Sequence, residues 1–243
     1  MNLIGKHVVV TGGTRGIGAQ IVKMFVAEGA NVICTGRQQA DLDVLQKNAP
    51  DNLSYVSLDL ENQESVMTFT QYLRDLGSLD VLVNNAGINK IDRIENISLA
   101  DFRSVMEVNV NGPFEISKIV GEMMMKKGGH ILNIASIWSN VTREGRASYS
   151  TSKAALVGLT RSLAVDLAAS GVLVNAVSPG FTATELTENS LTVEEIADLE
   201  TKIPCNRMAE PREIAELVLF LCSDKNTYIT GQNFVIDGGF SIV

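Results

Sequence analysis

Tyr149 and Lys153 are the residues whose types and spacing point most directly to chemistry. They are four residues apart in a stretch of helical periodicity, so both side chains lie on one face, about one turn apart. A phenol titrates near pH ~10 and alone exchanges its proton poorly at neutral pH, but a neighbouring ammonium lowers that pKa. We therefore expect Lys153 to lower the pKa of Tyr149 and the pair to transfer a proton at a carbonyl or carbinol oxygen. The alternative is a chance pair on a solvated helix.

The segment TGGTRGIG at 11–18 is expected to bind a dinucleotide. It follows the apolar run 8–10 and precedes a stretch of helical periodicity, which is the context that such a turn requires. Gly12 allows the tight turn, while Gly16 and Gly18 let the backbone approach a pyrophosphate and let the helix pack on the strand. The N–H groups at the start of that helix would then face the phosphates. The alternative is an ordinary loop between a strand and a helix.

The composition limits the class of protein. The chain has 243 residues, of which 45% are hydrophobic, enough for one large α/β domain. Its net charge is −8 with no basic tract, which argues against a nucleic-acid partner. No apolar run approaches membrane-spanning length and the N-terminus has no apolar signal region, so we expect no membrane partner and a cytoplasmic location.

Neither the cysteines nor the histidines suggest a metal site. Cys34, Cys205 and Cys222 have no metal-binding spacing, and their odd number argues against a disulfide framework. His7 and His130 begin apolar runs and have no acidic or histidine partner at ligand spacing. We therefore interpret the histidines as structural and expect no metal.

Short β-rich runs alternate with longer segments of helical periodicity. The expected strands are 7–11, 31–35, 53–58, 79–84, 130–135, 172–178 and 233–236. The expected helices are 17–28, 38–47, 62–76, 98–125, 148–169 and 210–222. Repeated βα units with right-handed crossovers predict a parallel sheet with helices on both faces.

The segment 181–209 interrupts this alternation. It is polar and is expected to form two short helices. A long insertion after the carboxyl end of a strand often covers a ligand site, so we interpret it as a substrate lid. The alternative is a surface helical hairpin.

Several motifs follow one another in the chain: TGGTRGIG at 11–18, DL at 59–60, NNAG at 84–87, the region of Asn109, Ser136, YSTSK at 149–153, PG at 179–180 and TGQNFVIDGG at 230–239. In this order and spacing they resemble the short-chain dehydrogenase/reductase family over essentially the whole chain. The resemblance implies one Rossmann-fold domain over 1–243, an α/β structure with a doubly wound seven-stranded parallel sheet.

The resemblance also implies four catalytic residues. Ser136 would hydrogen-bond the substrate oxygen, and Tyr149 would be the acid in reduction and the base in oxidation. Lys153 would lower the tyrosine pKa and hold the nicotinamide ribose, while Asn109 would fix a water that relays protons from Lys153 to solvent. As alternatives, Ser136 merely ends a strand and Asn109 caps or kinks a helix.

The remaining implied roles concern the cofactor. Asp59 and Leu60 would contact the adenine, although Asp59 could instead cap a helix, and Thr182 would lie near the carboxamide. The full expected set is Gly12, Thr14, Arg15, Gly16, Ile17, Gly18, Arg37, Asp59, Leu60, Asn84, Gly87, Tyr149, Lys153, Pro179, Gly180 and Thr182.

The end of the second expected strand favours NADP(H) over NAD(H). A carboxylate there would bind the ribose hydroxyls of NAD and repel the extra phosphate of NADP, but the sequence continues with Gly36 and Arg37. Arg15 lies inside the glycine turn, and two guanidinium groups suit a 2′-phosphate. The alternative is that Arg37 is a solvated loop residue.

Within the family the chain is most similar to 3-oxoacyl-[acyl-carrier-protein] reductases. The similarity lies in PGFTATELT at 179–187, in 207–224 and in YITGQNFVIDGG at 228–239. It implies NADPH-dependent reduction of a 3-oxoacyl thioester, with acyl carrier protein as a partner, and a homotetramer.

Two features depart from that pattern. The loop 168–171 lacks the basic residues that dock a carrier protein, and only Lys126 and Lys127 remain as a partial basic patch. Trp138, Arg143 and Arg146 occupy the segment between Ser136 and Tyr149, where small residues are usual, and we expect them to line the substrate pocket. An aromatic wall with arginines would also suit a sugar, polyol or nucleotide-sugar ketone.

A third alternative is a sensor that binds NADP without turnover. The presence of Asn109, Ser136, Tyr149 and Lys153 argues against it.

Overall fold

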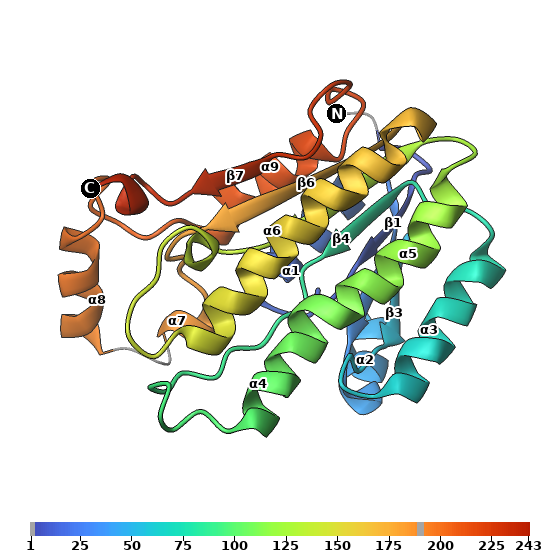
Figure 1. Ribbon diagram of the computed structural model, residues 1–243. Helices are drawn as coiled ribbons and strands as arrows, with labels where there is room; N and C mark the ends of the chain where they lie inside the picture. Colours follow the sequence, from blue (N-terminus) through green and yellow to red (C-terminus); the bar gives the residue numbers. More distant parts are fainter. Residues whose placement is uncertain (1–2, 189–191) are drawn as a thin grey trace.

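The computed structural model describes residues 3–188 and 192–243 and is built around a seven-stranded parallel sheet (Figure 1). The strands are β1 (His7–Val10), β2 (Asn31–Gly36), β3 (Leu53–Ser57), β4 (Val81–Asn84), β5 (Gly129–Ile134), β6 (Val172–Pro179) and β7 (Asn233–Ile236). Their order is β3-β2-β1-β4-β5-β6-β7, so the chain reverses direction across the sheet between β1 and β4. The doubly wound Rossmann fold is confirmed, and ligands bind such sheets at this switch point.

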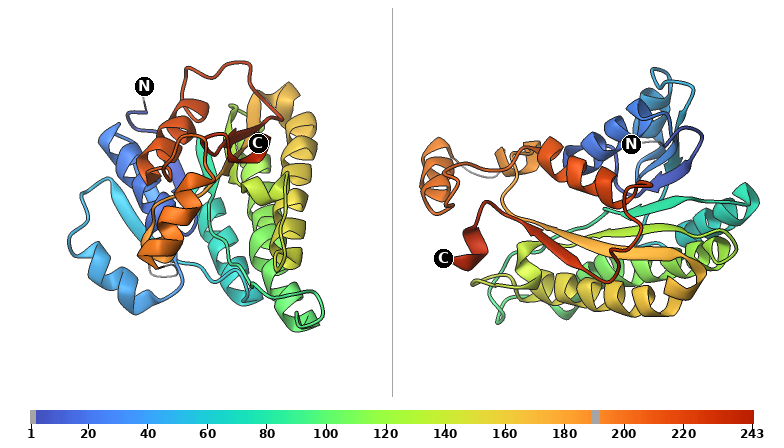
Figure 2. Two further views of the ribbon diagram at one scale, coloured as in Figure 1. Left: turned by 90° about the vertical axis from the view of Figure 1, so that its left-hand side faces the viewer. Right: turned by 90° about the horizontal axis from the view of Figure 1, so that it is seen from above.

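Helices cover both faces of the sheet. Its helices are α1 (Gly16–Ala27), α2 (Gln39–Gln46), α3 (Gln63–Leu76), α4 (Leu99–Met106), α5 (Gly112–Met124), α6 (Ala147–Leu167), α7 (Glu185–Glu188), α8 (Val193–Thr201) and α9 (Pro211–Leu221). Figure 2 shows α1 and α9 on one face and α5 and α6 on the other. Each layer buries its own apolar cluster, with Phe25 and Val218 in one and Phe69 and Ile116 in the other.

The expectation of a single helix over 98–125 is wrong, because the structure divides this segment. A five-residue π-helical segment, Glu107–Asn111, separates α4 from α5. Pro113 explains part of this break, because it has no N–H to donate to the carbonyl of Asn109, four residues earlier. Wide turns of this kind occur frequently at functional sites.

Two short helices, α7 and α8, occur in 181–209 as expected, and 189–191 lie outside the described residues. Leu199, Ile203 and Met208 form a small apolar cluster here, against which Phe181 and Phe240 pack. This segment is therefore attached to the C-terminal end of the chain.

Asp80 ties together the starts of three central strands. Its carboxylate accepts hydrogen bonds from the His7 N–H at 2.9 Å, from Lys127 Nζ at 3.1 Å and from Lys6 Nζ at 3.2 Å. Its main chain bonds to His7 and His130. Burial alone would raise the pKa of Asp80, but these donors outweigh burial and hold it below its usual range.

Asp80→Ala is expected to reduce the free energy of unfolding by about 2 kcal/mol at pH 7, because it removes hydrogen bonds to charged groups. The folded-state pKa of Asp80 is depressed, so its contribution is fully present above the unfolded value near ~3.9 and is lost as pH falls through the folded value. The free energies of unfolding of wild type and variant, measured with urea, should therefore approach each other as pH falls through the folded-state pKa of Asp80. Asp75→Ala, at an exposed carboxylate on α3, is the control; a difference independent of pH would contradict this account.

Candidate active site

The turns that follow β1 and β4 are bound to each other at the switch point. Thr11 Oγ1 accepts hydrogen bonds from the N–H groups of Asn85 and Ala86 at 3.0 and 3.1 Å. The Asn85 amide donates to the carbonyls of Thr11 and Gly12 at 3.0 and 2.9 Å. A Cβ on Gly12 would lie 2.9 Å from the Cα of Ala86, so no larger residue fits.

The glycine turn leaves room for a pyrophosphate. Gly12 and Gly16 have φ values of 62° and 55°, which favour glycine. A Cβ on Gly18 would lie 2.4 Å from the carbonyl oxygen of Gly12, so the expected close packing is present. No side chain caps α1, whose first N–H groups therefore remain available to an anion. Ile17 packs into the core and offers only its backbone.

Arg15 and Arg37 lie on adjoining segments beside this turn. A Cβ on Gly36 would lie 2.9 Å from Thr14 Cγ2, which places the end of β2 against the glycine turn. Both arginines are exposed, and neither forms an ion pair within residues 3–188 and 192–243. Their position and free charge fit the 2′-phosphate of NADP.

The side chains of Asp59 and Leu60 serve the protein itself. Asp59 Oδ1 accepts a hydrogen bond from the Glu61 N–H at 3.0 Å and so stabilises the turn before α3. Leu60 is buried, and its Cδ2 would lie 2.8 Å from a Cβ on Gly112. The main chain at this position is left for an adenine, and the expected adenine contact of Asp59 and Leu60 stays a prediction.

Asn84 belongs to a buried polar network that links both sides of the switch point. Its amide donates to Ser117 Oγ at 2.9 Å and to Asn133 Oδ1 at 2.8 Å, and Asn133 donates to Thr160 Oγ1 at 2.8 Å. The network joins β4 and β5 to α5 and α6. Asn84 therefore supports the site by fixing the elements around it.

Asn109 connects the π-helical segment to α6, the helix that carries Tyr149 and Lys153. Its Oδ1 accepts from the Ile88 N–H, and its Nδ2 donates to the Ile88 carbonyl and to Ser152 Oγ, each at 2.9 Å. Ser152 Oγ in turn donates to the carbonyl of Tyr149 at 2.8 Å. With the side chain of Asn109 fully bonded, its main-chain carbonyl is the group left to hold a water.

Ser136, Tyr149 and Lys153 converge at the carboxyl end of β5. Ser136 follows β5, and its hydroxyl lies close enough to the hydroxyl of Tyr149, at the start of α6, to favour the ionised phenol. Lys153 Nζ lies 5.6 Å from the centroid of the Tyr149 ring and donates to the Ile134 carbonyl at 2.8 Å. Gly87 completes the group, because a Cβ there would lie 3.4 Å from Lys153 Nζ.

The sequence predicted a lowered pKa for Tyr149, but in this structure that pKa is raised. Burial raises the pKa of Tyr149, and the groups that oppose this are the Ser136 hydroxyl and the charge of Arg146. The ammonium of Lys153 is directed to the Ile134 carbonyl, and burial lowers its own pKa to about 8. Tyr149 is thus protonated at neutral pH, as a proton donor must be.

The four residues expected to line the substrate pocket lie together. The Trp138 ring packs edge-to-face on Phe181 and Phe240, with centroids 6.1 and 6.4 Å away. The guanidinium carbons of Arg143 and Arg146 lie 5.3 and 5.4 Å from the Trp138 centroid. Trp138 therefore joins Ser136 to the segment 181–209 and to the C-terminal end of the chain.

The corner formed by Pro179 and Gly180 carries the chain back toward the glycine turn. The Gly180 N–H donates to the Ile236 carbonyl, and the buried Thr182 pairs with Ala209. Beyond it, Thr184 Cγ2 would lie 3.5 Å from a Cβ on Gly16. The start of the 181–209 segment thus covers the glycine turn.

Sequence reasoning missed several contributors: Thr11, Asn85, Ser152, Phe181 and Phe240. Three of them lie inside the quoted motifs as small polar residues next to the selected positions. The aromatic pair gave no signal, because only folding brings 181 and 240 to Trp138.

The described part of the chain has neither a cluster of metal ligands nor a helix that could span a membrane. No group of three or more histidines, cysteines, aspartates or glutamates could hold a metal ion. None of the described helices is long and apolar enough to cross a membrane.

A parallel sheet with a glycine turn at its switch point and a Ser–Tyr–Lys group beside it defines an oxidoreductase that uses a nicotinamide cofactor. The family model described as enoyl-(acyl carrier protein) reductase matches residues 12–241. The chain belongs to the short-chain dehydrogenase/reductase family.

The relatives include 3-oxoacyl-[acyl-carrier-protein] reductases. Those of Vibrio cholerae and Escherichia coli K12 are 36% and 34% identical, and each alignment covers 100% of both chains. A crystal structure assigned as a β-ketoacyl-ACP reductase has a TM-score of 0.90, 35% identity and full coverage of both chains. One assigned as a gluconate 5-dehydrogenase of Beutenbergia cavernae, with bound NADP, has a TM-score of 0.92 and 34% identity, covering 100% of this chain and 99% of that one.

The rate of ketone reduction is expected to fall as pH rises through about 8, because Lys153 then loses the charge that stabilises the Tyr149 phenolate. The value of kcat/KM between pH 6 and 10 reports groups of the free enzyme. In Lys153→Arg, where the side chain stays charged, the fall should move to higher pH. A wild-type rate that is flat or rises between about pH 7 and 9 would contradict the assignment.

Proposed function

We propose that the protein is an NADPH-dependent ketoreductase that converts a 3-oxoacyl thioester into the 3-hydroxyacyl form, as in fatty-acid synthesis. The observation that carries the proposal is the group formed by Ser136, Tyr149 and Lys153 at the carboxyl end of β5, with Lys153 Nζ 5.6 Å from the centroid of the Tyr149 ring. The full-length similarity to 3-oxoacyl-[acyl-carrier-protein] reductases supports the substrate class.

In this mechanism the hydroxyl groups of Ser136 and Tyr149 both bind the ketone oxygen, and the proton of Tyr149 goes to that oxygen. NADPH, when bound, supplies the hydride that the carbonyl carbon receives. The positive charge of Lys153 stabilises the phenolate that Tyr149 leaves behind. Pro113 has no N–H to donate to the main-chain carbonyl of Asn109. A water bound to that carbonyl would return a proton to the site.

The segment 181–209 acts in this proposal as a substrate lid within a single domain. Two contacts support this role. Thr184 lies next to Gly16 in the cofactor turn, and Phe181 packs on Trp138 in the expected substrate pocket.

Acyl carrier protein is the proposed partner in the cytoplasm. Lys127, one half of the expected basic patch, is paired with Asp80. Lys126 instead shares a cavity of about 270 Å³ with Arg74, between α3 and α5.

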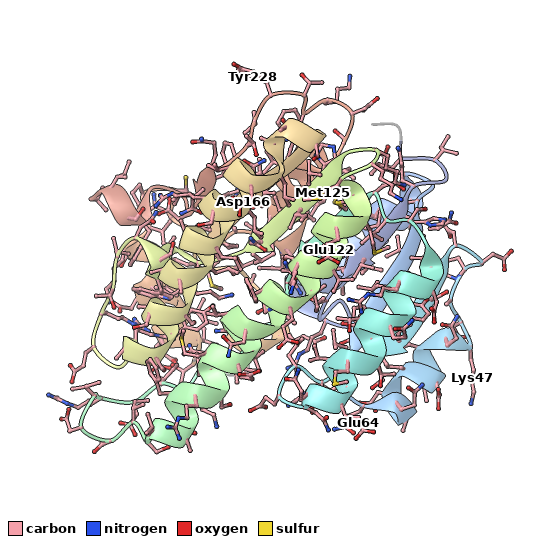
Figure 3. The ribbon with its side chains drawn as sticks, turned by 45° about the vertical axis from the view of Figure 1, so that its right-hand side comes forward. Lys47, Glu64, Glu122, Met125, Asp166 and Tyr228 are labelled. Carbon is pink, nitrogen blue, oxygen red and sulfur yellow. The ribbon has the colours of Figure 1, made fainter. Side chains whose placement is uncertain are left out.

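A homotetramer is also proposed, with α5 and α6 on one interface and β7 on another. The two helices run side by side on one face, where Figure 3 labels Met125 and Asp166. Phe114 and Val165 are 50% and 80% exposed there, and Val235 of β7 is 39% exposed.

Arg37→Ala is expected to weaken NADPH binding by about tenfold or more, because one charge-assisted contact to the 2′-phosphate is lost. NADH lacks that phosphate, so its dissociation constant should change little. Fluorescence titration with both cofactors measures this, with Lys47→Ala as the exposed control. Equal losses for the two cofactors would refute the role of Arg37.

Val165→Glu is expected to reduce the oligomer to a smaller species, because it would bury a charge at each copy of the α6 interface. Size-exclusion chromatography with light scattering measures the mass, and Lys47→Glu, directly after the distant helix α2 (Figure 3), is the control. An unchanged mass would show that α6 forms no interface.

The function itself is tested by NADPH oxidation with acetoacetyl-CoA, with NADH in parallel. Rapid turnover that prefers NADPH is expected. Tyr149→Phe should abolish turnover and leave NADPH binding nearly intact, because it removes only the proton donor. Absence of thioester reduction by a protein that binds NADPH would overturn the proposed substrate class.

A further inference from the structure

Arg146 is a buried cation without a protein partner. The residue is 9% exposed, and its Nε is enclosed and makes no hydrogen bond. No described residue forms a hydrogen bond or an ion pair with its guanidinium; the one contact is the Trp138 ring, at 5.4 Å. Burial of an unpaired charge is strongly unfavourable, so fold stability does not explain this arrangement.

A second positive charge lies near Arg146. Arg143 lies over the same Trp138 ring at 5.3 Å, and burial followed by the charge of Arg143 lowers the pKa of Arg146. Glu144, the nearest carboxylate in sequence, is paired with Arg93 instead. Two cations therefore share one aromatic surface with no anion between them among the described residues.

Arg146 lies near the reacting hydroxyl of Tyr149. Arg146 is three residues before Tyr149 and acts on its hydroxyl electrostatically, and Trp138 is two residues after Ser136. Arg15 and Arg37, which suit the cofactor phosphate, lie beside the glycine turn after β1 and β2. An anion at Arg146 would therefore belong to the substrate.

We propose that Arg146 and Arg143 form an oxyanion site in the substrate pocket, and that the enzyme also reduces oxo acids with a free carboxylate a few bonds from the ketone. A guanidinium binds a carboxylate through two parallel hydrogen bonds, whereas a thioester carbonyl brings no charge. The inference rests on the proposed ketone reduction, in which the carbon gains hydride from NADPH and the oxygen gains the proton of Tyr149.

Binding can be measured without catalysis, because Trp138 is the single tryptophan of the chain. Titration with 3-hydroxybutyrate should give a saturable change in its fluorescence, and methyl 3-hydroxybutyrate should give about tenfold weaker binding. Inorganic phosphate is the second probe: the tighter of the two anions identifies a carboxylate or a phosphoryl group as the natural oxyanion. No saturable response to either anion overturns the site.

Variants then locate the site. Arg146→Gln and Arg143→Gln should each weaken binding of the anion, the former by about tenfold or more. Arg161→Gln, at an exposed arginine on the same helix α6, should leave it unchanged. Equal anion binding in wild type and both pocket variants would overturn the proposal, even where one variant folds poorly.

Kinetics separate a charge-specific role from a structural one. Arg146→Gln should reduce kcat/KM for acetoacetate by about tenfold or more while the value for methyl acetoacetate changes by less than about threefold, with partial recovery in Arg146→Lys. Equal losses for both substrates would mean that Arg146 acts only through Tyr149 or through folding, against the proposal. Reduction of acetoacetate without reduction of acetoacetyl-CoA would overturn the proposed thioester function alone, and the reverse result would overturn the oxyanion site alone.

Discussion

The close approach of the turns after β1 and β4 is the constraint on which the rest of the site depends. Asn85 donates two hydrogen bonds to Thr11 across the point where the strand order reverses, and Gly12 lies directly against Ala86. A side chain between these turns would separate the two halves of the sheet. It would also close the space where the backbone must approach a pyrophosphate. The cofactor site and the union of the two halves therefore have the same geometric origin.

Buried polar groups carry this constraint to the catalytic helix. Asn84, Asn133 and Thr160 connect the central strands to α5 and α6, while Asn109 and Ser152 connect the π-helical segment to Tyr149. Polar bonds of this kind are directional, so they fix register in a way that apolar packing alone does not. The hydroxyl of Tyr149 is thus held at Ser136 before any substrate arrives.

Three groups of cations serve different tasks in a chain of net charge −8. The exposed pair, Arg15 and Arg37, can meet a phosphate from solvent. Lys153 is buried, and its pKa near 8 keeps its charge within reach of neutral pH. The Nε of Arg146 is buried and has no hydrogen-bond partner in the protein. Of the three groups, Arg146 is therefore the one for which a negatively charged ligand would offset the cost of burial.

The sequence by itself determined the parallel sheet, the dinucleotide turn and the identity of the catalytic group, because these are set by short-range spacing. Alternating apolar and helical segments indicate βα units, the glycines of 11–18 allow a turn that other residues cannot adopt, and Tyr149 and Lys153 are one helical turn apart. Only the tertiary structure decided where the charges act. Spacing predicted a lowered pKa for Tyr149, but burial raises it, and the ammonium of Lys153 donates to the Ile134 carbonyl. The meeting of Phe181 and Phe240 with Trp138 likewise depends on residues about 40 to 100 positions apart in the chain, and no local pattern encodes such contacts.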